Sequence, residues 1–279
     1  MESISCDSLW AVVVWYNPSI EEVRAIDWYK NDVKGVIIVD NSINDNSCLL
    51  SGLQGVTYIP QNENLGIAKA LNVGCQEAIK RGAKWVLTMD QDSLWNQHSV
   101  REYIEEANLY SGIANVGIFS PYHDCDGRPE THHRYGRYEQ KNVTMCSGNL
   151  LNLNAWKMVD GFRDDFFIDL VDDEICCHIR KLGLQVLVLN NILLTHKLGQ
   201  GIKYSRILKH PYTPHNAWRY YYIARNIRLM MILYPEMKKY YKKQLFKYIK
   251  RICLYDNDSK WMKLRKFYNG WSSAADLLS

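Results

Sequence analysis

Two short acidic segments carry the side chains in this 279-residue sequence whose types and spacing could do chemistry. In the first, Trp85 to Ser93, an apolar run ends in two carboxylates, Asp90 and Asp92, with one residue between them. If the run is a buried strand, the carboxylates lie where the chain leaves the sheet, and such a pair suits a hard divalent cation such as Mg²⁺ or Mn²⁺. The alternative is that both are turn residues or cap the next helix. This segment alone leaves both interpretations open.

The second segment, Phe166 to Glu174, places four carboxylates in six positions: Asp169, Asp172, Asp173 and Glu174. Carboxylates that repel one another beside apolar neighbours hold protons more tightly than isolated ones, and such a group can act as a general base. Asp and Glu are also favourable at the start of a helix, where they face the positive end of its dipole. Both roles can hold at once, with the segment beginning a helix and one carboxylate facing a cleft.

The segments that must position these carboxylates alternate between apolar runs and helical patterns. Strands are predicted at residues 9–15, 35–39, 56–59, 85–89, 115–120 and 185–194, and helices at 19–31, 64–80, 99–110 and, after a short loop from 166, up to 182. This alternation predicts an α/β fold with a mostly parallel central sheet covered by helices on both faces.

Ligands of such sheets bind beyond the carboxyl ends of the strands. In this sequence those ends carry polar residues: Asn17, Asp40-Asn41-Ser42, Asn62, Asn64, Asp90 and Asp92. They predict a nucleotide site at one edge of the sheet. No Gly-x-Gly-x-x-Gly follows the first predicted strand, so the sequence lacks the dinucleotide fingerprint of dehydrogenases.

The histidines have competing interpretations. The polar stretch 121–142 holds His123, His132 and His133 without regular ligand spacing, so a surface loop or hairpin is favoured over a metal site. His196 follows an apolar strand, where a hydrogen-bonded structural role is favoured. Its alternative is to add a nitrogen ligand to a metal already held by carboxylates.

Composition and cysteine usage indicate a cytoplasmic protein. No apolar run approaches the roughly 18 residues needed to span a bilayer, and Met1 to Leu9 lacks the basic and apolar regions of a signal peptide. The eight cysteines include no Cys-x-x-Cys pair, so neither a zinc site nor a disulfide framework is indicated. A reducing compartment is therefore expected.

The net charge of +4 is unevenly distributed along the chain. Residues 236–279 hold eleven Lys/Arg against four Asp/Glu, which leaves the remainder slightly acidic. Interleaved aromatic residues make this basic tail suitable for an anionic lipid surface, and a solvated basic helix packed on the domain is the alternative. Nucleic-acid binding is disfavoured because the rest of the chain is net acidic and contains no recognised module.

Six motifs, taken in order, resemble those of the inverting glycosyltransferases of family 2, which have the GT-A fold. They are Val12 to Pro18, Val39 to Ser42, Asn62 to Asn72, Met89-Asp-Gln-Asp-Ser93, Phe166 to Arg180, and His196-Lys-Leu-Gly199. The Met-Asp-Gln-Asp-Ser, Phe-Ile-Asp-x-Val-Asp-x-Glu and His-x-x-Gly forms are similar to the rhamnosyltransferase branch, as is the Arg219 to Asn226 region. The resemblance covers about residues 10–230.

The resemblance implies ligands for the donor. Asp90 and Asp92 match the Asp-x-Asp motif that holds a divalent cation, Mn²⁺ or Mg²⁺, on the donor diphosphate, and His196 matches an additional metal ligand. Asn17, Asp40, Asn64 and Asp90 stand at positions expected to contact the donor nucleotide.

The resemblance also implies a catalytic residue. Asp172 matches the base that takes a proton from the acceptor hydroxyl. Because Val171 stands where many relatives carry Glu, Asp169 and Asp173 remain rivals. A weaker expectation is that Gly148, Asn149 and Asp169 line the donor sugar pocket.

The activity implied is transfer of a sugar, with inversion, from a nucleotide-sugar donor to a saccharide acceptor, which a lipid can carry. The branch indicates L-rhamnose from dTDP-rhamnose, used in bacterial surface polysaccharide (O-antigen or capsule) synthesis. Alternatives are a UDP-sugar-dependent transferase of another hexose, a non-catalytic nucleotide-sugar-binding protein, and a membrane-associated protein.

The expected organisation is a glycosyltransferase domain at 1–200, with a nucleotide half at 8–120 and an acceptor half at 121–200. A basic helical region at 201–279 follows, suited to peripheral association with the cytoplasmic face of the inner membrane.

Overall fold

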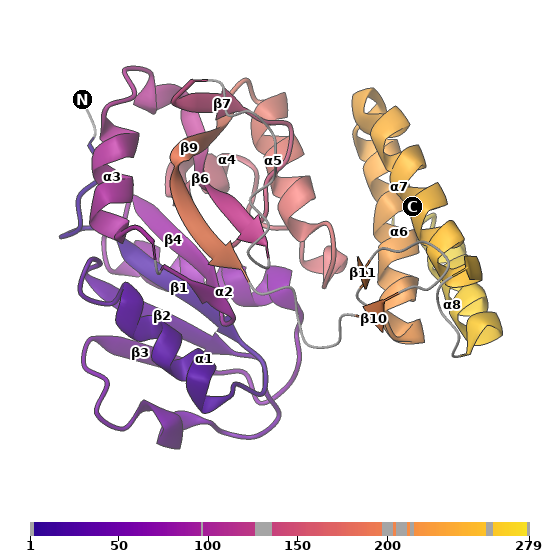
Figure 1. Ribbon diagram of the computed structural model, residues 1–279, viewed down its shortest axis with the longest axis horizontal. Coiled ribbons are helices and arrows are strands. Elements are labelled where there is room, and N and C mark those ends of the chain that lie inside the picture. The colour runs from indigo at the N-terminus through magenta and orange to yellow at the C-terminus, as the bar shows by residue number, and fades with distance from the viewer. Residues whose placement is uncertain are drawn as a thin grey trace. The chain divides into compact units, whose positions relative to one another are not determined.

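The computed structural model describes residues 3–95, 97–125, 136–196, 203–204, 211–212, 215–254 and 259–277 (Figure 1). The chain divides into two compact units. Unit 1 comprises Met1–Asp164 and Val171–Lys197, and unit 2 comprises Asp165–Leu170 and Leu198–Ser279. The short segment 165–170 therefore belongs with the C-terminal part of the chain, although it lies between two parts of unit 1.

The described residues of unit 1 form a nine-stranded sheet in the order β3-β2-β1-β4-β8-β6-β9-β5, with β7 also paired to β9. The strands are β1 (Trp10–Trp15), β2 (Gly35–Asp40), β3 (Val56–Pro60), β4 (Trp85–Asp90), β5 (Ser93–Leu94), β6 (Val116–Cys125), β7 (Tyr138–Gln140), β8 (Asn149–Asn152) and β9 (Gln185–His196). Strands β3, β2, β1 and β4 are all parallel. Beyond them the sheet is mixed, because β8 runs antiparallel to β4 and β6, while β6 and β9 are parallel.

Helices flank this sheet (Figure 1). They are α1 (Ile20–Arg24), α2 (Ile67–Lys80), α3 (Val100–Asn108), α4 (Leu153–Met158) and α5 (Val171–Lys181). Short 3-10 turns stand at η1 (Ala25–Trp28), η2 (Ser47–Leu50), η3 (Ile113–Asn115) and η4 (Asp164–Phe166). The predicted alternation of strands and helices is confirmed for these segments.

The central strands are buried because they are apolar along their whole length. All six residues of β2 are buried, as are the apolar residues of β4, which matches a strand covered on both faces. Helix α2 lies very close to β1, since a Cβ added at Gly74 would stand 2.2 Å from Val12 Cγ1. Glycine at this position therefore allows the helix to reach the sheet.

Most predicted boundaries lie within three residues of the observed ones, and two segments differ by more. The helix predicted at 19–31 is shorter, because α1 ends at Arg24 and η1 follows it. The stretch predicted as a loop or hairpin from residue 121 begins as strand: β6 continues to Cys125 because β9 runs beside it as far as His196. A register shift between Pro121 and Tyr122 accommodates this extension. His123 lies in β6, whereas His132 and His133 are outside the described residues.

Unit 2 is mainly helical. Its elements are α6 (Ala217–Leu233), η5 (Pro235–Met237), α7 (Lys238–Leu254), α8 (Lys260–Ser273) and the strand pair β10 (Lys203–Tyr204) and β11 (Pro211–Tyr212). Helices α6 and α8 pack closely, because a Cβ added at Gly270 would stand 1.9 Å from the carbonyl oxygen of Tyr221. Tyr220 of α6 contacts the rings of Tyr248 and Phe267 from the other two helices. No helix within the described ranges is long and apolar enough to cross a membrane.

Candidate nucleotide and catalytic site

The parallel strands of unit 1 bring Asp40 and Asp90 to the same edge of the sheet. In the strand register Asp40 is the partner of Trp15 and Asp90 is the partner of Val14, so the two aspartates flank the end of β1. This is the carboxyl edge of the parallel strands, where α/β sheets bind ligands.

Asp40 is 1% exposed, and its carboxylate accepts four hydrogen bonds. Ser42 donates from its N–H and its hydroxyl to Oδ1, at 2.9 and 2.5 Å. The amide of Asn46 and the hydroxyl of Tyr58 donate to Oδ2, at 2.8 and 2.7 Å. Asp40 therefore orders the loop after β2, a role that needs residues up to 18 positions away in the sequence.

The asparagines at this edge join neighbouring loops. The N–H of Asn17, which has φ of +48°, donates to the hydroxyl of Ser42 at 2.7 Å. The side-chain amide of Asn41 donates to the carbonyl oxygen of Gly66 at 2.9 Å. The side-chain oxygen of Asn64 accepts from the N–H of Gly66 at 3.0 Å, just before α2 begins. The loops after β1, β2 and β3 are thus tied together.

Asp90 ends β4, and Asp92 lies in the turn between β4 and β5; both side chains are half-buried. The next helix, α3, is capped by Ser99, so neither aspartate is a helix cap. Ser93, directly after Asp92, pairs with His196 across β5 and β9. The backbone of His196 therefore lies beside the Asp-x-Asp turn, while its side chain is outside the described part of the structure.

Gln91, between the two aspartates, links β4 to β1. Its side-chain oxygen accepts from the N–H of Tyr16 at 2.7 Å, and its amide donates to the carbonyl oxygen of Tyr16 at 3.4 Å. Gln91 stands within the Asp-x-Asp motif, yet its link to β1 was not predicted from the sequence. A long polar side chain between two candidate ligands was the available signal.

Ser147 connects the turn to the segment before β8. Its hydroxyl accepts from the N–H of Asp90 at 3.1 Å and donates to the hydroxyl of Ser93 at 2.7 Å. Its carbonyl oxygen is 2.7 Å from Nε2 of His123. Ser147 therefore holds the backbone of Asp90, and His123 has a structural contact in place of the metal role weighed from the sequence.

The two sugar-pocket candidates of unit 1 follow Ser147. Gly148 has φ of +79°, and an added Cβ would stand 2.6 Å from Leu194 Cδ2, so glycine is required here by packing. Asn149 begins β8 and is 4% exposed. Among the described residues, its side-chain oxygen is buried without a hydrogen-bond partner.

Asp172 lies in the first turn of α5, where its Oδ1 accepts from the N–H of Asp173 at 3.0 Å. Burial raises the pKa of the Cys146 thiol well above its usual value, and the negative charges of Asp90 and Asp172 raise it further. The segment that holds this thiol joins β4 to α5: the hydroxyl of Thr88 donates to the carbonyl oxygen of Cys146 at 2.6 Å, and the sulfur of Cys176 lies 4.0 Å from the carbonyl oxygen of Thr144. Burial and the charges of Asp172 and Asp173 raise the pKa of Cys176 in the same way.

The third candidate base, Asp169, belongs to unit 2. Arg219 forms a bidentate ion pair with Asp169: Nε lies 3.0 and 3.2 Å from the two carboxylate oxygens, and Nη2 lies 2.9 Å from Oδ1. An Arg–carboxylate pair of this geometry fixes the orientation of both side chains. Within unit 2, Asp169 is therefore a partner of helix α6.

The rest of the 165–170 segment is also bound to α6. Phe167, Asp169 and Leu170 have φ of +58°, +63° and +61°, a left-handed conformation that non-glycine residues rarely adopt. The side-chain amide of Asn226 lies 2.8 to 2.9 Å from the carbonyl oxygens of residues 166, 168 and 169. These contacts offset the cost of the strained backbone. No local sequence pattern predicted them.

The described side chains include no group of three or more His, Cys, Asp or Glu that could hold a metal ion by themselves. Two carboxylates at a strand end fit Mg²⁺ or Mn²⁺ when a substrate diphosphate completes the coordination. Asp90 and Asp92 are such a pair.

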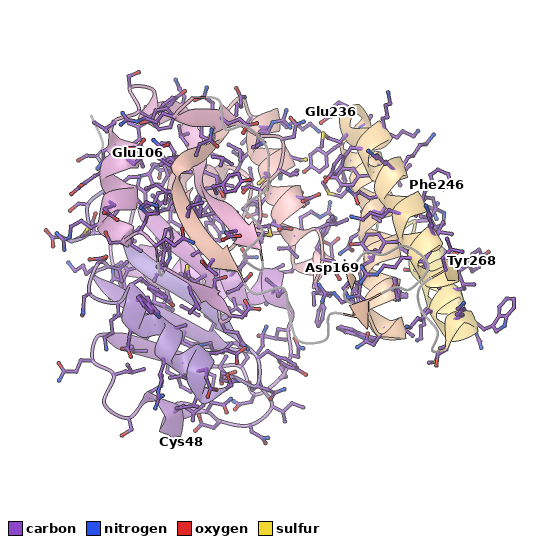
Figure 2. All side chains as sticks on the ribbon, viewed as in Figure 1. Cys48, Glu106, Asp169, Glu236, Phe246 and Tyr268 are labelled. Atoms are coloured by element: carbon purple, nitrogen blue, oxygen red, sulfur yellow. The ribbon has the colours of Figure 1, made fainter. Side chains whose placement is uncertain are left out.

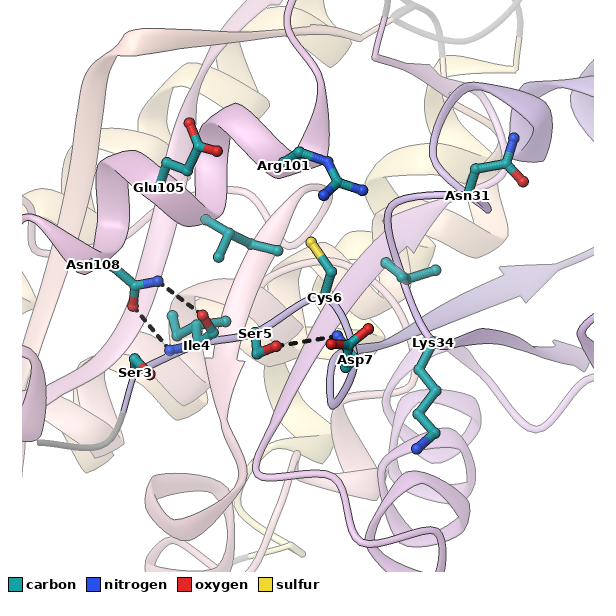
Figure 3. Close-up of a pocket in the computed structure, with 12 residues that line it drawn as sticks. Ser3, Ile4, Ser5, Cys6, Asp7, Asn31, Lys34, Arg101, Glu105 and Asn108 are labelled. Carbon is teal, nitrogen blue, oxygen red and sulfur yellow. Dashed lines mark hydrogen bonds between the residues drawn. The ribbon is translucent and has the colours of Figure 1, made fainter.

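A separate pocket of about 690 Å³ lies among residues that precede β1 and β2 and residues of α3 (Figure 3). Its lining includes Ser5, Cys6, Lys34, Arg101 and Asn108. Because residues before parallel strands lie at the amino edge of the sheet, this pocket is on the opposite edge from Asp40 and Asp90.

Comparison with known proteins decides the family. The model of the family described as "Glycosyl transferase family 2" matches residues 17–170, more than half of the chain. The chain belongs to glycosyl transferase family 2. This glycosyltransferase is 28% identical over 242 residues to the "dTDP-rhamnosyl transferase RfbF" of Shigella flexneri, with 80% of each protein covered. The predictions of the family and of a glycosyltransferase are confirmed.

Solved structures of low identity share the fold of this glycosyltransferase. S. aureus TarS matches with a TM-score of 0.59 and 13% identity, covering 98% of this chain and 49% of that one. GalNAc-T7, solved with UDP, GalNAc and Mn²⁺, matches with a TM-score of 0.60 and 10% identity, covering 96% and 56%. The chain thus spans about half the length of these structures, and the predicted GT-A fold with a C-terminal helical extension is confirmed.

Proposed function

We propose that this glycosyltransferase transfers L-rhamnose from dTDP-rhamnose to a saccharide acceptor, with inversion, in the synthesis of a bacterial surface polysaccharide such as O-antigen or capsule. Support for the donor comes from the similarity to RfbF, which extends over 80% of both chains. Support for the chemistry comes from one observation above all: segment 144–147 contacts both β4, which ends in Asp90, and α5, which carries Asp172. The metal-binding carboxylates and the base must lie close together, because the donor's diphosphate contacts the first while the acceptor hydroxyl that attacks the donor contacts the second.

In this proposal the carboxyl edge of β1, β2 and β4 binds the donor nucleotide, with Asn17, Asp40 and Asn64 ordering the loops that contact it. Asp90 and Asp92, with His196 as a further ligand, would hold a divalent cation, which would supply positive charge to stabilise the departing diphosphate. Ser147 keeps the backbone of Asp90 in place.

Asp172 acts as the general base. It takes the proton of an acceptor hydroxyl as that oxygen bonds to the anomeric carbon, on the face opposite the diphosphate. The bond from the anomeric carbon to the diphosphate oxygen breaks, the nucleoside diphosphate leaves, and the configuration is inverted. Asp173 shares the first turn of α5 and is the rival for this role; Asp172 is favoured because it stands at the position of the family's base.

Asn149 lies two residues after Ser147, which is hydrogen-bonded to Asp90 and Ser93, and this supports a place for Asn149 near the donor sugar. Gly148 shapes the same turn. Asp169 is the weakest of the three sugar-pocket candidates, since Arg219 already occupies its carboxylate.

The proposal extends to the acceptor and its location. We propose a saccharide carried on a membrane lipid, with the enzyme on the cytoplasmic face of the membrane. The excess of basic residues in the C-terminal tail supports this, as do the seven described cysteines, which are all free thiols as in a reducing compartment.

The metal assignment is tested by Asp92→Ala. We expect wild-type protein to bind dTDP more tightly when Mn²⁺ is present, and the variant to lose that metal-dependent gain, measured by calorimetry with and without Mn²⁺. Asp27→Ala, which removes an exposed carboxylate on η1, is the control and should bind like wild type. Unchanged metal-dependent affinity in the Asp92 variant would refute the metal site, and tighter binding of UDP than dTDP would replace the proposed donor.

A further inference from the structure

One face of helix α7 is covered with exposed lysines. Six exposed residues of α7 follow one another at intervals of three, one, three, one and three positions, beginning at residue 239. This spacing places all six on a single face of the helix. These residues form the lysine face of α7: Lys239, Lys242, Lys243, Phe246, Lys247 and Lys250. Phe246 is 67% exposed (Figure 2).

Folding of unit 2 does not explain the lysine face. The helix buries Tyr241 and Ile252 on its other side. That side packs against the rest of unit 2, so the lysine face is not needed for packing. No Asp or Glu occurs between residues 238 and 254 to balance the charge. Lysines three or four positions apart on a helix repel one another and destabilise it by a few tenths of a kcal/mol per pair. A surface of this kind is stabilised when an anionic partner covers it.

The single apolar side chain within the lysine face indicates which anion. Phe246 has lysines on both sides along the face, so a partner that neutralises the charge must also receive an exposed aromatic ring. A bilayer with anionic lipids does both, because its headgroups attract lysine while the region beneath them accepts apolar side chains. On the neighbouring helix α8, Trp261 is 86% exposed, and Tyr268, which Figure 2 labels, is 69% exposed. Such rings are typical of membrane interfaces.

We propose that the lysine face of α7 binds the surface of an anionic lipid bilayer, with Phe246 inserted among the headgroups. Membrane binding depends on the proposed function only for its biological role, which is to hold the enzyme where a lipid-carried acceptor is presented. Binding itself needs neither donor nor metal.

The test uses the full chain and two kinds of vesicle, phosphatidylcholine alone and phosphatidylcholine mixed with phosphatidylglycerol. We expect wild type to sediment with the mixed vesicles and not with the neutral ones, and to be released by salt. The triple variant Lys243→Gln, Lys247→Gln, Lys250→Gln should bind the mixed vesicles roughly a hundredfold more weakly, at about 1 kcal/mol for each lysine. Phe246→Ser should weaken binding while keeping its salt dependence.

A matched control separates the lysine face from net charge. The triple variant Lys34→Gln, Lys157→Gln, Lys181→Gln removes the same charge from exposed positions of unit 1 and should bind like wild type. Equal losses in both triple variants, or equal binding to neutral vesicles, would overturn the proposal. So would a preference for RNA over mixed vesicles in competition. If the lysine variants bind dTDP in a metal-dependent way, they are folded. If wild-type protein does not bind dTDP, that result counts against the proposed function and not against membrane binding.

Discussion

At the scale of single residues, chemistry depends on which of several neighbouring carboxylates faces the substrate. Asp169, Asp172 and Asp173 lie within five positions of one another, yet the structure gives them different surroundings. Asp169 is paired with Arg219 in unit 2, whereas Asp172 lies in the first turn of α5 in unit 1, the unit that also holds Asp90. A base must also contact the acceptor hydroxyl, and both carboxylate oxygens of Asp169 are already hydrogen-bonded to Arg219.

Asp172→Asn is therefore expected to lower kcat by about 10² to 10⁴, because the variant cannot accept the acceptor's proton. Metal-dependent binding of dTDP should remain, since the amide keeps the shape of the side chain. Asp173→Asn is the matched control in the same helical turn, and it should retain most of the activity. Sugar transfer from dTDP-rhamnose and calorimetry with dTDP measure the two properties. Loss of turnover in the Asp173 variant, with activity retained in the Asp172 variant, would reassign the base.

At the scale of elements, a strained segment is held by a helix from a distant part of the sequence. Residues 165–170 contain three left-handed non-glycine residues, and Asn226 of α6 lies within hydrogen-bond distance of three of their carbonyl oxygens. The ring of Phe167 stacks on Tyr222 at 4.9 Å between centroids. A segment that is unfavourable by itself is thus stabilised by its contacts.

Asn226→Ala is expected to destabilise the protein by about 1–3 kcal/mol, because buried carbonyl oxygens lose their donor. Thermal and urea unfolding of the full chain measure the change. Asn269→Ala, at an exposed position of α8, is the control and should change stability by less than about 0.5 kcal/mol. The assigned role of Asn226 is wrong if both variants unfold at the same denaturant concentration.

At the scale of the whole molecule, charge is divided between the units. Unit 1 has 17 Lys/Arg and 24 Asp/Glu, whereas unit 2 has 17 Lys/Arg and 6 Asp/Glu. Part of the cationic charge of unit 2 surrounds His215, which lies near Arg219, Arg251 and Lys263 of three different helices. Burial and these three cations lower the pKa of His215 to about 3.

The stability of the protein should accordingly depend on the protonation of His215. Between pH 6.5 and 3 the histidine binds a proton in the unfolded chain but stays neutral in the folded one, so stability falls as the pH falls through this range. The slope from this group is at most about 1.4 kcal/mol per pH unit. His215→Gln should make the free energy of unfolding less dependent on pH in this range, measured by urea unfolding at several pH values. A variant with the same slope as wild type would contradict this assignment.

Local patterns in the sequence predicted much of the fold. The apolar runs became β1, β2, β3, β4 and β9, and Asp90 and Asp92 stand at the end of β4 as expected. These predictions succeeded because a buried strand needs a continuous apolar run, and polar residues must follow where the chain returns to solvent. The order of the motifs also identified the family.

Only the tertiary structure decided which side chains meet. Tyr58 reaches Asp40, Ser147 joins Asp90 to Ser93, and Asn226 binds the carbonyl oxygens before α5. The assignment of segment 165–170 to the C-terminal unit was likewise invisible in the sequence. These contacts join residues up to 60 positions apart, and their geometry depends on how strands and helices pack. Residue types and periodicity encode the elements, but not the distances between side chains on different elements.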